Sequence, residues 1–182
     1  SPVLKGTIEI RVKLSEPGAV ATGFSVPIIL DWRKLKGYEE RSTISNVSVN
    51  GQAAAVQNHP VAEAATPLHG KEGSLVYQEQ AEHLIFRDGV VEGENVIKLD
   101  FTSPILTSGS AITRYVDKED GSEYIYSLFV PSDASTAFPV FDQPDLKARF
   151  TLTLSAPKSW RSIVSNFELD HMIIVDGICG LP

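Results

Sequence analysis

The sequence predicts an all-β protein, built as a sandwich or saddle of mostly antiparallel strands. Apolar residues alternate with polar ones over several short stretches, which is typical of strands with one buried face. Eleven prolines and thirteen glycines, some of them in Asn-Gly or Asp-Gly pairs, supply frequent turns between those stretches. Strands with one apolar face are stabilised by stacking on another sheet, so a sandwich is the expected architecture.

The first predicted strand spans residues 4–14. Its polar positions are Lys, Thr, Glu and Arg, and the apolar residues that alternate with them are Leu4, Ile8, Ile10, Val12 and Leu14. Residues 25–31 form a second candidate strand. Pro27 cannot donate a backbone hydrogen bond, so it favours an edge position or the start of a strand.

A β-hairpin is predicted over residues 47–56. Asn50-Gly51 at its centre readily takes the two positive φ angles of a type I′ turn. Residues 52–73 are weakly patterned and are expected to be loop with at most a short strand. Asp88-Gly89 and Asp120-Gly121 mark further turns between short apolar runs.

Two later stretches, residues 97–101 and 150–154, also alternate and predict strands with one face on a core. A third short candidate is residues 172–175. The apolar positions of the two alternating stretches are Ile97, Leu99, Phe101, Phe150, Leu152 and Leu154.

Composition narrows the classes of function. The chain has 182 residues, enough for one domain or slightly more with its own core. A formal net charge of −7 argues against nucleic-acid and anionic-membrane partners, because both attract clustered Lys and Arg. The longest run of large apolar residues, 172–175, is far below the ~20 of a membrane-spanning helix. We expect a soluble chain, cytoplasmic, periplasmic or secreted. The single cysteine, Cys179, excludes an intramolecular disulfide.

No motif for catalysis or metal binding is complete. A zinc peptidase needs H-E-x-x-H, which puts two histidines on one helical face around the metal, and the sequence has no such motif. His59, Glu63 and His69 come nearest to a metal cluster, but Pro60 spoils a helix there, which favours ordinary surface histidines. Residues 155–158 match S-x-x-K yet follow a strand pattern. We predict no catalytic residue and no metal ligand in this chain.

The most specific stretch is residues 117–150, which reads DKEDGSEYIYSLFVPSDASTAFPVFDQPDLKARF. It resembles the N-terminal β-domain of zinc aminopeptidases of the aminopeptidase N type, and its centre resembles that family's Phe-Pro-Cys-Phe-Asp-Gln/Glu-Pro signature. The likeness spans roughly residues 4–166. The signature residues here are Phe138, Pro139, Val140, Phe141, Asp142, Gln143 and Pro144.

The resemblance implies a non-catalytic domain that docks on a thermolysin-like catalytic domain and forms one wall of the peptide-binding cleft. Zinc is expected only in that catalytic domain, which this chain lacks, so the chain alone is predicted to be inactive. The signature residues are expected to be structural. Phe138, Phe141 and Pro144 form a plug, Val140 replaces cysteine as a small hydrophobe, and the carboxylate of Asp142 fixes the tight turn.

Val130 is the substrate-cleft position by resemblance. The family usually has Glu or Gln there, which helps to hold the substrate's free α-amine through a charge-assisted hydrogen bond. Valine cannot accept that bond. We therefore expect Val130 either to face the cleft without binding the amine or to be an ordinary strand residue.

We expect residues 1–166 to form the β-domain, truncated or stand-alone, and residues 167–182 to be a divergent tail. If the tail strand at 172–175 leaves a sheet edge uncovered, a homodimer through strand pairing is expected. Two other functions stay open. One is a free-standing hydrolase, an esterase or peptidase that acquired activity on this scaffold, and the other is a β-sandwich binding or scaffold protein.

Overall fold

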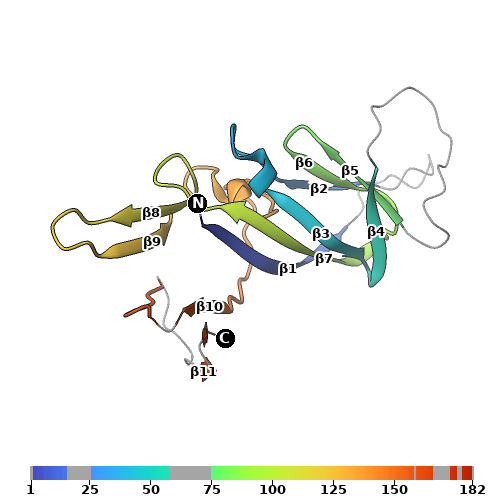
Figure 1. The fold of residues 1–182 in the computed structure, drawn as a ribbon. Helices are drawn as coiled ribbons and strands as arrows, with labels where there is room; N and C mark the ends of the chain where they lie inside the picture. Colours follow the sequence, from blue (N-terminus) through green and yellow to red (C-terminus); the bar gives the residue numbers. More distant parts are fainter. Residues whose placement is uncertain are drawn as a thin grey trace. The chain divides into compact units, whose positions relative to one another are not determined.

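The computed structural model describes residues 2–15, 26–57, 75–157 and 159–165, together with the backbone of two further strands near the C-terminus. It divides into two units, Ser1–Leu146 and Lys147–Pro182. Figure 1 shows them coloured along the chain. The regular structure of the described residues is strand and short 3₁₀ helix, which confirms the all-β prediction. Within these residues, no helix is long and apolar enough to cross a membrane.

One curved, seven-stranded sheet organises the first unit (Figure 1). Its strand order is β1-β7-β3-β4-β5-β6-β2. The pair β4 and β5 is parallel and the other neighbours are antiparallel, as predicted. The strands are β1 (Val3–Leu14), β2 (Ile28–Asp31), β3 (Thr43–Val49), β4 (Gln52–Gln57), β5 (Leu75–Gln80), β6 (His83–Phe86) and β7 (Gly93–Pro104).

β1 and β7 pair along their full length, from Val3 opposite Pro104 to Leu14 opposite Gly93. The predicted alternation holds in β1, where half-buried positions alternate with exposed ones. Gly6 lies beneath the ring of its partner Phe101, and a Cβ on Gly6 would come within 2.7 Å of that ring. Only glycine fits there without moving the aromatic side chain.

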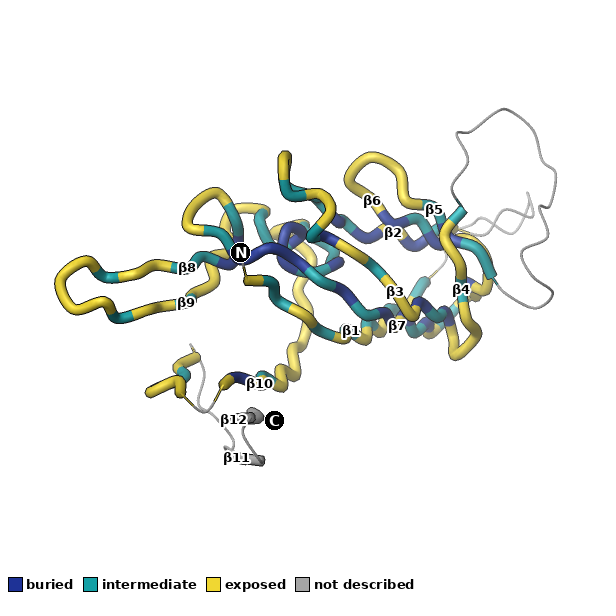
Figure 2. Tube along the Cα trace, in the orientation of Figure 1, coloured by how far each residue is buried: buried dark blue, intermediate teal, exposed yellow. Residues whose placement is uncertain are grey.

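The main core is formed by side chains of the sheet and of Trp32, which follows β2 and is 1% exposed. Figure 2 shows that buried residues are concentrated along β2, β6 and β7. The apolar residues of β1 pack around this core. Its other buried members are Ile28, Leu30, Val47, Val49, Tyr77, Leu84, Phe86, Val90, Ile97, Leu99 and Phe101.

A smaller apolar cluster lies beyond the end of β7 and anchors a hairpin made of β8 (Ile112–Val116) and β9 (Glu123–Ser127). Its buried members are Ile105, Ala111, Ile112 and Ala137. Leu4 and Phe138 pack against both this cluster and the main core. The rest of the hairpin extends away from the sheet and is largely exposed (Figure 2).

The predicted hairpin at Asn50-Gly51 is confirmed. These two residues join β3 to β4 with φ angles of 51° and 83°, as a type I′ turn requires. The side chain of Asn50 donates to the carbonyl of Gly89 at 2.8 Å and accepts from the backbone N–H of Val96 at 2.8 Å. These two bonds attach the turn to the loop before β7 and to the first residues of β7.

Asn95 is a fully buried amide on β7 that completes this junction. Its Oδ1 accepts from Asn50 Nδ2 at 3.0 Å and from Val91 N at 2.9 Å. Its Nδ2 donates to the carbonyls of Val91 at 2.7 Å and Gly93 at 3.1 Å. A buried amide with these bonds satisfied holds the loop before β7 in one conformation.

One carboxylate links three neighbouring strands. Asp100 on β7 accepts from Thr7 Oγ1 on β1 at 2.5 Å and from Asn46 Nδ2 on β3 at 2.7 Å. Asn46 lies at the register shift between Ser45 and Ser48 and has a φ of 50°. The Thr7 hydroxyl, and then the Asn46 amide, lower the pKa of Asp100 because they bind its charged form.

β2 is an edge strand, as Pro27 predicted. It begins at Ile28 rather than at residue 25, and residue 25 lies outside the described residues. A short 3₁₀ helix, η1 (Glu39–Arg41), precedes β3. The short strand allowed within residues 52–73 is β4, and residues 58–74 lie outside the described residues.

The second unit contains β10 (Leu154–Pro157), β11 (Ile173–Val175) and β12 (Ile178–Leu181), with β12 paired antiparallel to both others. β11 lies within the predicted tail strand at residues 172–175, and residue 172 lies outside the described residues. The strand predicted at residues 150–154 is wrong over residues 150–153, where Phe150 and Leu152 are 68% and 62% exposed. The register of β10 with β12 begins at Leu154, which lies opposite Leu181.

We expect Asp100→Asn to destabilise the protein at neutral pH and to matter less in acid. A carboxyl group whose pKa is lowered in the folded state stabilises that state at pH values above its ordinary pKa. This stabilisation is lost as the pH falls through the lowered pKa. Melting temperatures of wild type and variant, measured from pH 7 down to the acid limit of folding, should therefore converge. Asp145→Asn, at an exposed position, controls for the change in net charge. A gap that stays constant with pH would contradict this role for Asp100.

Candidate functional site

The segment from residue 128 to residue 144 carries both Val130 and the signature residues. It leaves β9, passes through η2 (Ala134–Thr136) and returns to the end of β2. There Asp31 N donates to the carbonyl of Val140 at 2.7 Å, and Val140 N donates to the carbonyl of Asp31 at 3.1 Å. At its start, Leu128 N donates to the carbonyl of Ala111 at 2.8 Å. The segment is thus attached to β2 near one end and to the residue before β8 at the other.

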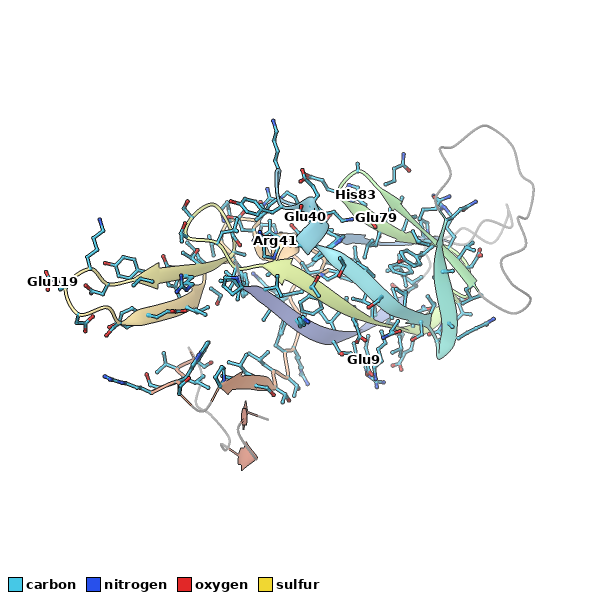
Figure 3. The ribbon with its side chains drawn as sticks, viewed as in Figure 1. Glu9, Glu40, Arg41, Glu79, His83 and Glu119 are labelled. Atoms are coloured by element: carbon cyan, nitrogen blue, oxygen red, sulfur yellow. The ribbon has the colours of Figure 1, made fainter. Side chains whose placement is uncertain are left out.

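Two aspartates reinforce this junction by accepting hydrogen bonds from backbone N–H groups. Asp31 Oδ2 accepts from Asp142 N at 2.9 Å, and Asp142 Oδ2 accepts from Ser135 N at 2.9 Å. The carboxylate of Asp142 therefore orders η2, seven residues upstream, rather than its own turn. Asp31 Oδ1 also lies 3.1 Å from Nδ1 of His83, which stands at the start of β6 (Figure 3).

Arg33 holds the other side of the segment. Its guanidinium pairs with the carboxylate of Asp133, and its Nη2 donates to the carbonyl of Ser132 at 3.3 Å. Its backbone N–H donates to the carbonyl of Ser135 at 3.0 Å. Because both charged side chains are partly exposed, the pair contributes at most about 1 kcal/mol, and its main effect is to orient the loop.

Phe138 is the aromatic centre of the segment. Its ring centroid lies 5.5 Å from that of Phe129 in an edge-on arrangement and 6.3 Å from that of Phe101 on β7. Edge-on and tilted aromatic pairs of this kind are favourable beyond their buried area. Since Phe138 also packs against both apolar clusters, it connects the segment, the sheet and the base of the β8–β9 hairpin.

The remaining signature residues divide between the core and the surface. Pro139 is fully buried, and Phe141 is partly buried against the main core. Gln143 and Pro144 are exposed. The expected plug therefore includes Phe138 and Phe141 but not Pro144, which lies in an exposed turn where Leu146 N donates to the carbonyl of Gln143 at 3.1 Å.

Val130 lies at the exposed end of the segment and is 73% exposed. It is outside the named strands, in a turn in which Asp133 N donates to the carbonyl of Phe129 at 2.9 Å. Its side chain presents only aliphatic surface to solvent. The arrangement places Val130 and the signature residues on one segment, with Val130 outward and Phe138 inward.

A shallow open pocket of about 160 Å³ lies between β2 and this segment. The side chains of Asp31, Arg33 and Asp142 in its lining make the contacts described above. The lining residues are Asp31, Arg33, Glu82, Ser132, Ser135, Asp142 and Gln143. Among the described residues, no group of three or more His, Cys, Asp or Glu side chains is arranged to hold a metal ion. His59, Glu63 and His69 lie outside those residues.

The sequence did not indicate the partners of the segment 128–144 or the contact between Asp31 and His83. Asp31, Arg33 and His83 stand far along the chain from Asp142, and no spacing rule relates them. The one available signal was that Asp31 ends an apolar run. A polar residue at the end of an edge strand is a common place for a side chain to bind a neighbouring loop, but it does not identify the loop.

Comparison with known proteins gives a consistent assignment. A family model described as the peptidase M1 N-terminal domain matches residues 3–173. Aminopeptidase N of Streptomyces lividans is 36% identical over 78 residues, which are 43% of this chain and 9% of that protein. Glutamyl aminopeptidase of Sus scrofa is 30% identical over 112 residues, 59% of this chain and 11% of that protein. The chain therefore corresponds to a small part of each relative's length.

A solved structure is similar in fold. Native leukotriene A4 hydrolase from Saccharomyces cerevisiae aligns with a TM-score of 0.56 and 15% identity, over 98% of this chain and 24% of that one. At this identity the likeness concerns the fold alone, and three quarters of that protein lie outside the aligned region.

We expect Phe138→Ala to reduce the free energy of unfolding by about 2–3 kcal/mol, because it removes a ring shared by two apolar clusters. Urea denaturation followed by tryptophan emission in the presence of iodide, which quenches the exposed Trp160 first, measures this change. Leu128→Ala, at a position 61% exposed on the same segment, is the matched control and should cost less than about 1 kcal/mol. Equal losses in the two variants would contradict the bridging role of Phe138.

Proposed function

Because this chain belongs to the peptidase M1 N-terminal domain family, we propose that it is the non-catalytic N-terminal domain of a zinc metallo-aminopeptidase-like protein. In this role it docks on a catalytic domain and forms one wall of the peptide-binding cleft. The observation that carries the proposal is the family match over residues 3–173, which includes the whole segment 128–144. Zinc and the hydrolytic residues belong to the catalytic domain.

A cleft wall has to keep its shape while substrate enters and leaves. The bridge between Asp31 and Val140, together with the carboxylate of Asp142, supports this requirement, since these contacts fix the segment that carries Val130. The same contacts leave the carboxylates bound to backbone N–H groups. They are therefore suited to holding the wall in place rather than to transferring protons.

The test is complementation. The partner is the Streptomyces lividans aminopeptidase N expressed without the domain that this chain resembles. We expect this chain alone, with added zinc, to hydrolyse neither an amino-acid p-nitroanilide nor an ester substrate. We expect it to bind the shortened enzyme in isothermal titration calorimetry and to raise its melting temperature.

Two results would overturn the proposal. Zinc-dependent turnover proportional to this chain alone would favour a free-standing hydrolase. Failure to bind the shortened enzyme, while that enzyme's own N-terminal domain binds it, would favour an unrelated binding or scaffold protein.

In the complex, we expect Val130→Glu to lower the KM for amino-acid p-nitroanilides about tenfold with little change in kcat. A carboxylate at this exposed position can accept a charge-assisted hydrogen bond from the substrate's α-ammonium group, worth about 1.5–3 kcal/mol. Val130→Leu is the matched control, because it changes size without adding an acceptor. Equal KM values in the two variants would show that Val130 does not face the amine.

A further inference from the structure

The two faces of the β8–β9 hairpin differ in chemistry. The register places Tyr115 opposite Tyr124 and Thr113 opposite Tyr126, so these four side chains share one face. We call this the tyrosine face. The other face carries Ile112, Arg114, Val116, Glu123 and Ile125. One face is thus aromatic, and the other is mixed.

The tyrosine face is exposed and free of charge. Tyr115, Tyr124 and Tyr126 are 50%, 52% and 52% exposed, and the rings of Tyr115 and Tyr124 stack at a centroid distance of 6.3 Å. The hairpin's strand charges lie on the other face, where Arg114 donates to both carboxylate oxygens of Glu123 at 2.7 Å. That bond raises the pKa of Arg114 and lowers the pKa of Glu123, so both stay ionised on the face opposite the tyrosines.

Among the described residues, the contacts that pack the hairpin are at its base. Ile112 is buried in the smaller apolar cluster, and Ile125 packs against it from the same face. A two-stranded hairpin is marginally stable on its own, and contiguous exposed aromatic surface usually marks a site of interaction. Contact surfaces are enriched in tyrosine and depleted of charge at their centres. The tyrosine face has both properties.

We propose that the tyrosine face is the surface through which this chain docks on its catalytic domain, an inference that rests on the function proposed above. The face continues toward the proposed cleft wall, because Leu128, Phe129 and Val130 follow β9 directly and are 61%, 37% and 73% exposed. The strand that carries Tyr124 and Tyr126 therefore leads directly into the position assigned to the cleft.

The area of this surface favours a domain of the same enzyme over a second copy of this chain. A half-exposed tyrosine presents on the order of 100 Å². The tyrosine face together with Leu128 and Phe129 then presents on the order of 500 Å². Burying that area on each of two partners gives about 1,000 Å², within the range of interfaces between domains but below the ~1,200–2,000 Å² of stable complexes between separate proteins.

The charge at the tip of the hairpin indicates the chemistry of the partner surface. The turn between β8 and β9 contains Asp117, Glu119 and Asp120 against one lysine, Lys118, and Glu119 marks this far end in Figure 3. Around an aromatic centre, an acidic rim favours a partner that is apolar opposite the tyrosines and basic opposite the tip. The docking surface of the catalytic domain should have this pattern.

The test uses a triple variant, Tyr115→Thr/Tyr124→Thr/Tyr126→Thr, which removes the aromatic rings of the tyrosine face. Its control is Val116→Thr, because Val116 is 41% exposed on the opposite face of the same hairpin. Threonine keeps the preference for strand structure. Binding to the shortened Streptomyces lividans enzyme is measured by calorimetry. We expect the triple variant to weaken binding at least about 30-fold and Val116→Thr to change it less than about twofold.

A second measurement uses the wild-type chain and needs no variant to fold. Tetranitromethane nitrates accessible tyrosines, and mass spectrometry locates them. We expect Tyr115, Tyr124 and Tyr126 to be nitrated in the free chain and protected in the complex. Binding that survives the triple substitution, equal nitration in the complex, or self-association lost in the triple variant would each overturn the docking surface alone. Absence of any binding would overturn the proposed function, and the docking surface with it.

Discussion

The backbone hydrogen bonds that β7 exchanges with β1 on one side and β3 on the other hold the first unit together. Several structural features are placed relative to this strand. Asn95 at its start fixes the preceding loop and the β3–β4 turn, and Asp100 in its middle joins the three strands. Phe101 receives the ring of Phe138, and beyond Pro104 the chain enters the smaller cluster that anchors the hairpin. A shift in the register of β7 would displace the segment 128–144 as well as the sheet.

The site couples two kinds of contact with different consequences. Aromatic packing around Phe138 fixes the depth of the segment relative to the sheet, whereas the Asp31–Val140 bridge and the Asp142 carboxylate fix its path. Both lie on the inner side, and Val130 and the tyrosine face are left outward. Under the proposed function, such a domain supplies shape and contact area, and the catalytic domain performs the chemistry.

Much of the fold could be predicted because period-two alternation and turn residues act locally. Residues 4–14 and 97–101 lie in β1 and β7, whose one apolar face is buried. The same pattern failed at residues 150–153, which lie outside the named strands although apolar and polar residues alternate there. The contacts of Asp142 could not be predicted, since its partners Asp31 and Ser135 are chosen by the tertiary path of the chain. The tyrosine face could not be predicted either, because the register between β8 and β9 decides which tyrosines of the two strands share a face.

The chain's two tryptophans fall in different units: Trp32 in the first, 1% exposed, and Trp160 in the second, 41% exposed. A water-soluble quencher such as iodide will therefore reach Trp160 before it reaches Trp32. The emission that remains under quenching reports the main core, and the quenched fraction reports the C-terminal unit. The molecule thus carries two spectroscopic reporters, through which the unfolding of each unit can be followed in one cuvette without any added label.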